Sequence, residues 1–532
     1  MRLSCTLSLL MLMVAGSAWG QSAYPRGGTL TYCEGRLPRT FDPITASEDM
    51  ESVRLSRLLY EGLFQVDISK AVRPGIAQPT RFLPDGRRMS IALRSGLKWS
   101  DGGEITAQDV TSTFEAMRRA TNRNLQTRVA DIVSVQPTGT YDLLITFRSI
   151  IDRRNMPKLL AFPILPRHKL QELPLTVRSD IAVQPVGSGF YKFVGRDAKT
   201  IHLEANEQYR KRGGNVEGPY IDKINILHIP DAASQVDHIR LGKVDILVEV
   251  PPSQIAILNA EGMSLPDYES LSFEFLAINH TNPLLAIREV RQAMEYGFDR
   301  DNILTRVYQR KGTLVAGPFP PYLKSYSLDV PPFEYNPEKA IGLLTGAGFT
   351  TIGNGGIRQD AAGRRLEFII VWPKPVGTAN MNIQVLNQFI SDMRKIGIEI
   401  TPRELGDDSY RDVVLYKRDF DLAFATFVYN EVGVVEPMFK STNTEPGQLN
   451  FISYKNKDVD ALLDEYERND GRAEVLDNIN KRLALILRDD CPYLFLWSLQ
   501  KTAAARPRVH NFITTVTPYS FFDYANRWYL AD

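Results

Sequence analysis

The chain is too long to fold around one hydrophobic core. It has 532 residues, of which 43% are hydrophobic, whereas a single core stops growing at about 250 to 300 residues. We therefore expect at least two lobes that pack separately. From Gly28 onward, candidate strands, turns and helices alternate irregularly, which favours mixed α/β lobes over an array of repeats.

A strand–helix–strand order in the C-terminal half predicts a parallel sheet there. A well-marked helix begins at the capping residue Asn336, with Pro337 in its first turn. The chain continues into an apolar strand over 366–372, a helix over 383–396 and a strand over 398–400. Two strands joined by a helix form a βαβ unit, whose strands run parallel. The inward positions of the second helix are Ile383, Leu386, Ile390, Met393 and Ile396.

Other elements are marked elsewhere along the chain. Residues 29–33 form a strand candidate near the start. Thr106 and Asp109 have the spacing of a capping box, with Asp in place of Glu, and predict a helix. Near the end, a helix over 475–486 precedes an apolar strand over 493–499. The apolar face of the helix after Thr106 would comprise Val110, Phe114 and Met117.

The first 20 residues have the composition of a secretory signal peptide. Arg2 is their one charged residue, an apolar run follows over 7–14, and the small residues Ala18 and Gly20 precede Gln21. We expect cleavage after Gly20. A membrane anchor, the alternative, needs about 18 or more uninterrupted apolar residues. Polar side chains interrupt this segment early, at Ser4, Thr6 and Ser8.

The sequence predicts a soluble periplasmic product. Cys5 precedes the apolar run, so it cannot become the lipid-bearing first residue of a lipoprotein. No later segment is long and apolar enough to span a bilayer.

The mature chain would be electrically balanced. Without Arg2 it has 62 basic and 62 acidic residues, which gives no support to nucleic-acid binding. The six histidines are scattered without metal-ligand spacing, so we expect no metal site and no cofactor. The remaining cysteines, Cys33 and Cys491, would be in a compartment that permits disulfide formation. We favour the interpretation that both are buried free thiols.

Sequence motifs of catalysis are missing. Gly187-Ser188-Gly189 lacks the Gly-x-Ser-x-Gly elbow, and the chain has no His-Glu-x-x-His, phosphate-binding loop or dinucleotide fingerprint. Pairs such as Asp407 and Asp408 are too common among 62 acidic residues to indicate glycosidase chemistry. We therefore expect no catalytic residues, with a periplasmic hydrolase as the less favoured alternative.

Several sequence blocks occur in a characteristic order over nearly all of the mature chain. They are Phe41-Asp42-Pro43, Leu58-Leu59-Tyr60-Glu61-Gly62-Leu63, Arg73-Pro74-Gly75-Ile76-Ala77, Leu93-Arg94-Ser95-Gly96-Leu97-Lys98-Trp99-Ser100-Asp101-Gly102, Ile105-Thr106-Ala107-Gln108-Asp109-Val110, Pro185-Val186-Gly187-Ser188-Gly189-Phe190-Tyr191, Gly242-Lys243-Val244-Asp245, Val290-Arg291-Gln292-Ala293, Asp299-Arg300 and Tyr335-Asn336-Pro337-Glu338-Lys339-Ala340. With these blocks, the chain resembles the extracytoplasmic solute-binding proteins of family 5, which include the oligopeptide-, dipeptide- and nickel-binding proteins of ABC importers.

This resemblance implies a fold class and a division of the chain. The fold would be α/β, with the two-lobe architecture of periplasmic binding proteins, two hinge crossings and a subdomain inserted into lobe one. Lobe one would comprise residues 24–275 and 500–532, the inserted subdomain about 50–180, and lobe two residues 276–499. Residues in such crossings absorb the rotation of lobe closure. The crossings would be the strand 493–499 and the segment 273–279.

The resemblance also implies a ligand between the lobes, where contacts from both lobes favour the closed state. The lobe-one segments that would face it are 34–39, 187–189 and 248–252. Within them, Arg36 can donate two hydrogen bonds to a carboxylate, and Glu249 can accept from an ammonium. For both residues, a solvated surface charge is an equally weighted alternative.

On lobe two, the family's peptide binders use a Trp-x-x-Asp stretch whose Asp pairs with the α-ammonium of the peptide. Here the strand over 420–423 leads to Phe427-Val428-Tyr429-Asn430-Glu431, with Phe427 at the aromatic position and Asn430 at the acidic one. An amide lacks the charge that makes such a hydrogen bond about twice as strong. Either Glu431 or Glu249 binds the ammonium, or the ligand has no free α-amine.

Trp497, on one of the expected crossings, is a further candidate wall of the site. Its large flat side chain can pack on ligands of variable shape, and packing in the core is the alternative. The implied ligand is a peptide or related polar oligomer, which a monomer would deliver to the membrane permease of an ABC importer. A metal chelate, haem or an oligosaccharide are alternative ligands on the same fold, and docking on a receptor as a sensor or chaperone-like protein is an alternative use of it.

Overall fold

The computed structural model describes most of the chain after residue 23. The predicted signal peptide, residues 1–20, lies outside the described residues, as do Asn430 and Glu431. The described ranges are 24–46, 50–66, 72–78, 80–120, 125–126, 129–150, 160–212, 218–270, 272–319, 330–374, 381–428, 436–469, 473–512 and 521–531.

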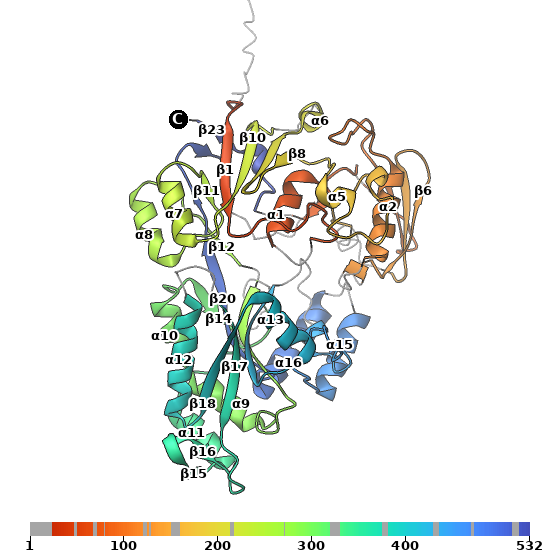
Figure 1. The fold of residues 1–532 in the computed structure, drawn as a ribbon. Coiled ribbons are helices and arrows are strands. Elements are labelled where there is room, and N and C mark those ends of the chain that lie inside the picture. Colours follow the sequence, from red (N-terminus) through yellow and green to blue (C-terminus); the bar gives the residue numbers. More distant parts are fainter. Residues whose placement is uncertain are drawn as a thin grey trace, which may run out of the picture.

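Two large sheets define an upper and a lower part of the molecule as it is oriented in Figure 1. The upper part is built on a six-stranded sheet with the order β21-β11-β1-β10-β9-β8. β1 is parallel to β10 on one side and to β11 on the other, and it confirms the strand expected at 29–33. The strands are β1 (Thr29–Glu34), β8 (Tyr191–Arg196), β9 (Thr200–Ala205), β10 (Lys223–His228), β11 (Ile246–Leu247) and β21 (Ala504–Ala505).

A four-stranded sheet extends the upper part to one side (Figure 1). Its buried side chains and those of helix α2 (Ala107–Arg118) join the same continuous core as the six-stranded sheet. The backbone N–H of Thr106 donates to the Asp109 carboxylate at 2.8 Å, which confirms the expected capping box. The strands, in the order β4-β5-β7-β6, are β4 (Arg81–Phe82), β5 (Arg88–Ala92), β7 (Asp142–Phe147) and β6 (Ile132–Pro137).

The lower part is built on a seven-stranded mixed sheet. β17 runs parallel to both β18 and β19, whereas β13 runs antiparallel to β19 and β20. Helix α12 (Met381–Lys395) connects β17 to β18, which confirms the βαβ unit expected here. The strands are β12 (Asp267–Glu269), β13 (Ser272–Ile278), β14 (Gly312–Leu314), β17 (Glu367–Pro373), β18 (Glu399–Leu405), β19 (Leu422–Val428) and β20 (Tyr493–Thr502).

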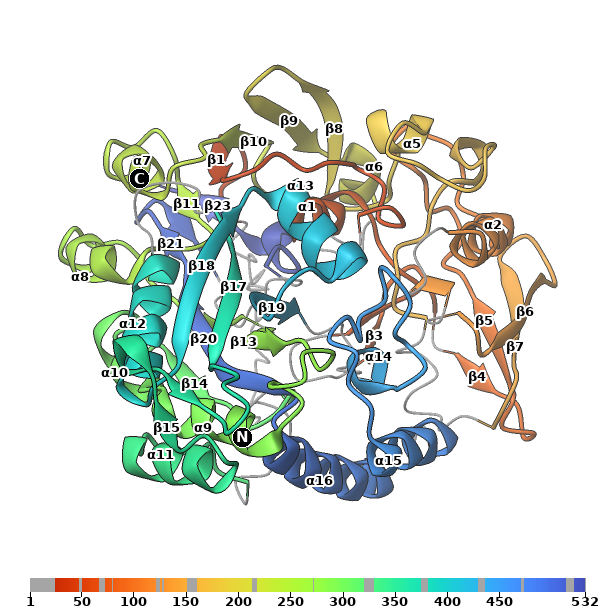
Figure 2. The same ribbon diagram turned by 60° about the horizontal axis from the view of Figure 1, so that its bottom comes forward.

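Helices cover both faces of the seven-stranded sheet, and Figure 2 shows α12 and α16 on opposite sides of it. One buried cluster joins the sheet to α9, α11 and α12, and a second joins it to α15 and α16. The Asn336 side chain accepts a hydrogen bond from the backbone N–H of Lys339 at 3.0 Å and caps α11, as predicted. The helices of this part are α9 (Arg288–Gly297), α10 (Arg300–Arg306), α11 (Pro337–Gly346), α12, α13 (Asp407–Arg411), α14 (Glu436–Phe439), α15 (Lys457–Arg468) and α16 (Ala473–Asp490).

Shorter elements complete the described fold. Altogether the described residues pack into four hydrophobic clusters, in line with the expectation that this length requires more than one core. The other elements are α1 (Met50–Leu59), α5 (Asp180–Val183), α6 (Glu207–Arg210), α7 (Ala232–Arg240), α8 (Pro252–Ala260), β2 (Phe64–Val66), β3 (Val72–Pro74), β15 (Thr351–Ile352), β16 (Arg358–Gln359), β22 (Val509–His510) and β23 (Tyr529–Leu530).

The chain passes between the two large sheets along paired segments, residues 264–270 and 499–505, which we call the connecting ribbon. β12 pairs antiparallel with the end of β20, and the backbones of Ser264 and Ala505 exchange two hydrogen bonds of 2.9 Å. The expected crossings, 493–499 and 273–279, instead lie almost entirely inside the seven-stranded sheet as β20 and β13. These segments continue directly into the connecting ribbon, at residues 499 and 270.

Cys33 and Cys491 are both buried free thiols. They belong to different hydrophobic clusters, Cys33 near α7 and α8 and Cys491 in the lower part. In the described part of the chain, no helix combines the length and the hydropathy that crossing a bilayer requires.

Candidate ligand-binding site

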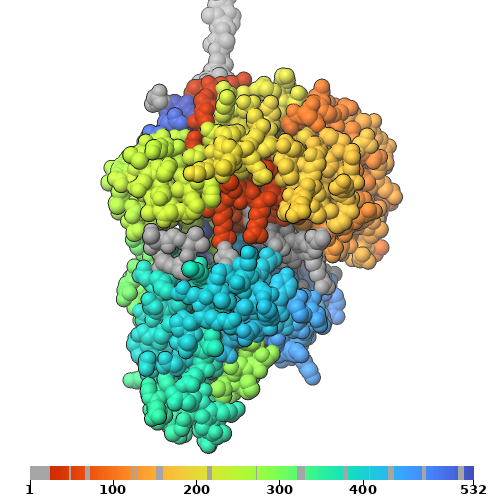
Figure 3. All heavy atoms as spheres, viewed as in Figure 1, coloured from red at the N-terminus to blue at the C-terminus, as the bar shows by residue number. Residues whose placement is uncertain are grey.

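The carboxyl ends of parallel strands from both parts point toward one region, which we call the interpart region. In the upper part β1, β10 and β11 end at the lower edge of their sheet, and in the lower part β18 leads up to α13 (Figure 1). In the space-filling view, the red N-terminal segment and the cyan segment face each other at this level (Figure 3). Because open α/β sheets bind ligands outside the carboxyl ends of their strands, this region is the candidate site.

A buried ion pair holds the upper edge of the interpart region. Glu34, the last residue of β1, accepts two hydrogen bonds from Arg54 of α1, at 2.8 Å from Nε and 2.7 Å from Nη2. Both side chains are almost fully buried, and the Glu34 carboxylate raises the pKa of Arg54 despite the opposing effect of burial. This two-point pair fixes α1 against the end of β1. Arg36, two residues beyond the strand, is exposed at the same edge.

Glu249 lies just beyond β11 and contacts the connecting ribbon. Its carboxylate accepts a hydrogen bond from Lys501 Nζ at 2.6 Å, and its side chain is 52% exposed. The predicted acidic residue is therefore at the edge of the interpart region, but an internal cation already neutralises it.

At the lower edge, Phe427 and Val428 end strand β19. The half-buried ring of Phe427 lies 5.7 Å from the ring of Phe273, on the side of α15 and α16. Val428 is 39% exposed and points to the opposite face, because successive strand residues alternate. These two residues therefore lie at the edge of the interpart region, whereas Asn430 and Glu431 lie outside the described residues.

Trp497 lies in the interior of the lower part. Its side chain is fully buried, its ring lies 5.2 Å from that of Tyr308, and its Nε1–H donates to Glu274 Oε2 at 2.7 Å. A buried indole offers no surface to a ligand, so the core alternative describes this residue and the candidate wall does not.

Glu274, on β13, is a residue of the site that sequence reasoning missed. It is half-buried, and burial raises the pKa of its carboxyl group to about 7, against the hydrogen bond from Trp497. Lys501 also lowers this pKa and Glu249 raises it further, so the charges of the Glu249–Lys501 pair act on Glu274. A lone carboxylate in the apolar run Phe273 to Ile278 is the signal that would have found it.

The turn 187–189 is packed against α1 and does not present polar groups to the interpart region. Ser188 is fully buried. A Cβ atom on Gly187 would lie 1.8 Å from the Leu59 carbonyl oxygen, so the backbone approach there requires glycine. The Gly189 N–H donates to the same carbonyl at 2.9 Å. These contacts assign the turn a packing role.

The described residues hold no group of three or more His, Cys, Asp or Glu side chains arranged as metal ligands. The described polar groups of the interpart region include two carboxylates, Glu249 and Glu274, with Lys501 and the exposed Arg36. Such a set can bind a charged or polar molecule by hydrogen bonds and ion pairs.

Comparison with known proteins identifies similar chains with the same fold. Residues 71–446 match the family model for bacterial extracellular solute-binding proteins, family 5 middle. The oligopeptide-binding protein AppA of Bacillus subtilis (strain 168) is 26% identical, over 89% of this chain and 86% of AppA. Heme-binding protein A of Haemophilus influenzae is 23% identical, with 98% of each chain covered.

Two solved structures show the fold. AppA from Bacillus subtilis, in complex with a nonapeptide, superposes with a TM-score of 0.80 at 23% identity, covering 96% of this chain and 100% of AppA. NikZ from Campylobacter jejuni, in complex with Ni(L-His), also gives 0.80 at 23% identity, covering 94% and 99%. The fold is therefore the mixed α/β fold of these binding proteins. Because the family model spans more than half of its length, the chain belongs to the bacterial extracellular solute-binding proteins of family 5.

Proposed function

We propose that this protein is a non-catalytic solute-binding component of an ABC importer that captures a peptide or related polar oligomer. The observation that carries the proposal is the pair of opposed sheet edges, whose parallel strands end toward each other on either side of the connecting ribbon. Closure of the two parts would hold the ligand in a cleft at the interpart region and favour the closed state. The loaded protein, a monomer, would then dock on the membrane permease.

The lobe boundaries belong to this proposal. Lobe one would comprise residues 24–275 and 500–532, with the inserted subdomain at about 50–180, and lobe two residues 276–499. The connecting ribbon crosses the boundary at 499/500, whereas the boundary at 275/276 falls inside β13, a few residues beyond the ribbon and within the lower part. Rotation at the ribbon would open and close the cleft.

The proposed ligand contacts come from both edges. Arg36 would bind a carboxylate, and Glu249 or Glu431 an ammonium, while Phe427 and Val428 would contact apolar groups. Asn430 replaces the acid of the family's peptide binders at the end of this set. The chain would reach the periplasm through its N-terminal signal peptide.

A chelate is the second candidate ligand. Two observations favour it: Asn430 removes the acid that peptide binders place there, and heme-binding protein A is similar to the chain over 98% of both lengths. Arg36 would then bind an anionic group of the chelate.

Native mass spectrometry of the protein purified from the periplasm, followed by identification of the released small molecule, tests the proposal. We expect a peptide, and titration with mixed tripeptides should change the intrinsic Trp and Tyr fluorescence. If the ligand has a free α-amine, Asn430→Asp should tighten its binding by about tenfold. A protein that carries haem or another chelate and ignores peptides would favour the second candidate, and turnover of any ligand would contradict both.

A further inference from the structure

We propose that Glu274 and Glu249 form a subsite for a cationic group of the ligand, an ammonium or a guanidinium, at the ribbon end of the cleft. This inference rests on the proposed function, because it assumes that the ligand lies between the two parts. It adds the chemical class of the ligand, which carries a positively charged group that reaches the end of the cleft next to the connecting ribbon.

The two carboxylates come from opposite parts, and each lies next to the connecting ribbon or to the strand that continues it. Glu249 follows β11 of the upper part and Glu274 lies in β13 of the lower part. Lys501, on the ribbon, is bound to Glu249 at 2.6 Å and also acts electrostatically on Glu274. A group bound here would therefore contact both parts and stabilise their closed arrangement.

The charges of this subsite are unbalanced. Glu249 has a direct cationic partner in Lys501, whereas Glu274 receives a hydrogen bond from the neutral Trp497 indole. Within the described residues, Glu274 Oε1 has no hydrogen-bond partner and belongs to a half-buried side chain. A partly desolvated carboxylate without a cation is unfavourable, and a positively charged ligand group would supply the missing charge.

Tyr308 is a second buried polar group near Glu274 whose hydrogen bonding is incomplete. Its side chain is 3% exposed, and its hydroxyl has no hydrogen-bond partner in the described structure. The ring packs on Trp497 at 5.2 Å, and the nearby charges of Glu274 and Glu249 add to the effect of burial in raising the pKa of this phenol. A buried hydroxyl without a partner is unusual, and this one belongs to a ring that packs on Trp497, the hydrogen-bond donor to Glu274.

Affinity measurements on matched variants test the subsite. The probes are histidine-free tripeptides with a free amino terminus, the same peptides N-acetylated, lysine amide and spermidine, titrated by calorimetry at pH 7.5. Glu274→Gln keeps the shape and an acceptor for Trp497 but removes the charge. We expect it to weaken binding of the cationic probes by about tenfold or more and to leave the N-acetylated peptides unchanged. The control is Glu269→Gln, at a ribbon carboxylate bonded to Gln500 at 2.9 Å, which should change neither.

The pH dependence separates an electrostatic role from a structural one. The titratable groups acting on Glu274 are Glu249 and Lys501, with Tyr308 packed beside Trp497. Since the pKa of Glu274 is raised to about 7, cationic probes should bind the wild type more weakly at pH 5.5 than at 7.5. In Glu274→Gln this pH dependence should largely disappear. Should Glu274→Gln misfold, Glu249→Gln measures the same selectivity.

The outcomes distinguish the subsite from the function. Equal affinity of wild type and both charge-neutral variants for cationic peptides overturns the subsite and leaves peptide capture intact. A wild type that ignores all tripeptides but binds lysine amide or spermidine through Glu274 overturns peptide capture and supports the subsite. Failure to bind any cationic probe overturns the subsite.

Discussion

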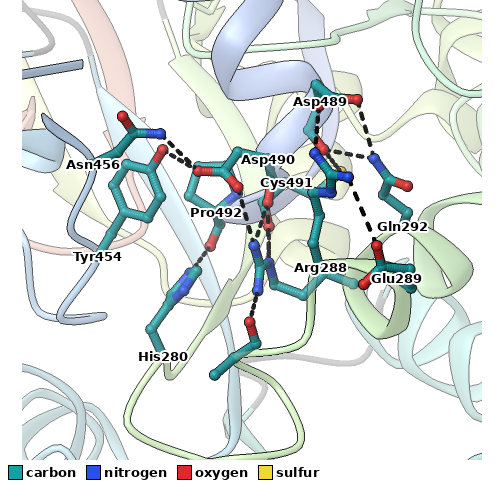
Figure 4. Close-up of polar contacts among 12 residues, drawn as sticks. His280, Arg288, Glu289, Gln292, Tyr454, Asn456, Asp489, Asp490, Cys491 and Pro492 are labelled. Atoms are coloured by element: carbon teal, nitrogen blue, oxygen red, sulfur yellow. Dashed lines mark hydrogen bonds and ion pairs between the residues drawn. The ribbon is translucent and has the colours of Figure 1, made fainter. Parts of the chain in front are cut away.

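His280 is a histidine that the fold keeps neutral. Its Nε2 lies 3.2 Å from the carbonyl oxygen of Pro492, to which the ring N–H donates, and the ring packs 5.3 Å from Tyr454 (Figure 4). Burial and the nearby Arg291 guanidinium lower the pKa of His280 to about 4. Protonation would place a second positive charge beside that guanidinium.

We predict that His280→Gln reduces the acid sensitivity of the protein. In the unfolded chain, His280 becomes protonated below the ordinary histidine pKa of about 6.5. In the folded chain it becomes protonated only near pH 4. The free energy of unfolding therefore falls as the pH drops through this range, by up to about 3 kcal/mol from this residue. Glutamine can still donate to Pro492 and does not titrate.

Urea unfolding at pH 7.5 and pH 4.5 measures this effect. The difference in stability between the two pH values should be smaller in His280→Gln than in the wild type, while His228→Gln, at a half-exposed side chain, should behave like the wild type. An unchanged difference in His280→Gln would contradict the prediction.

At the residue scale, sequence reasoning identified exposed positions better than buried ones. Arg36, Glu249 and Val428 lie at the edges of the interpart region, in segments that the family resemblance implied would face the ligand. Trp497 is in the core, which was the alternative to a wall of the site, and Glu274 was missed although a lone carboxylate in an apolar run marks it. The sequence does not show which face of its strand an aromatic residue or a carboxylate occupies. That face depends on the register with strands that are distant in the sequence.

At the scale of elements, Arg291 joins α9 to the junction between α16 and β20. Its guanidinium donates to the carbonyl oxygens of Asp490 at 2.7 Å and Cys491 at 3.1 Å, and to two carbonyls of the loop before α9 at 2.9 and 2.8 Å. The side chain is almost fully buried. It thus satisfies carbonyl groups at a helix end that have no partner inside the helix.

We predict that Arg291→Lys destabilises the protein by about 3 kcal/mol or more, because an ammonium cannot reproduce the planar fork and leaves buried carbonyls unpaired. Arg288→Lys provides the control on the same helix. Arg288 is half exposed and bonded to Asp489 at 3.0 Å, so its replacement should cost less than about 1 kcal/mol. Similar urea midpoints for the two variants would refute this assignment.

Most regular elements were predictable from local signals. The caps of α2 and α11 and the βαβ unit around α12 depend on residues within one helix turn or on one hydrophobic period. The connecting ribbon, in contrast, is defined by pairing between residues more than 200 positions apart. Local sequence carries no information about such a partner.

At the scale of the whole molecule, the two parts should move as units about the connecting ribbon. We predict that addition of the native ligand lowers the radius of gyration in solution scattering toward the value of about 24 Å that a compact chain of this length would have. The reason is that a ligand bound to both edges favours the closed arrangement. A radius that stays constant at saturating ligand would show that binding occurs without closure.

The pairing of the two ribbon segments constrains the direction of any such motion. Backbone hydrogen bonds between 264–270 and 499–505 keep the segments in register, so the parts can swing but cannot slide along each other. The two edges should consequently meet in the same alignment at every closing event. Every ligand would then meet the same arrangement of the two edges. Its fit next to the connecting ribbon, where the rotation takes place, would determine whether the parts of the edges farthest from the ribbon can close.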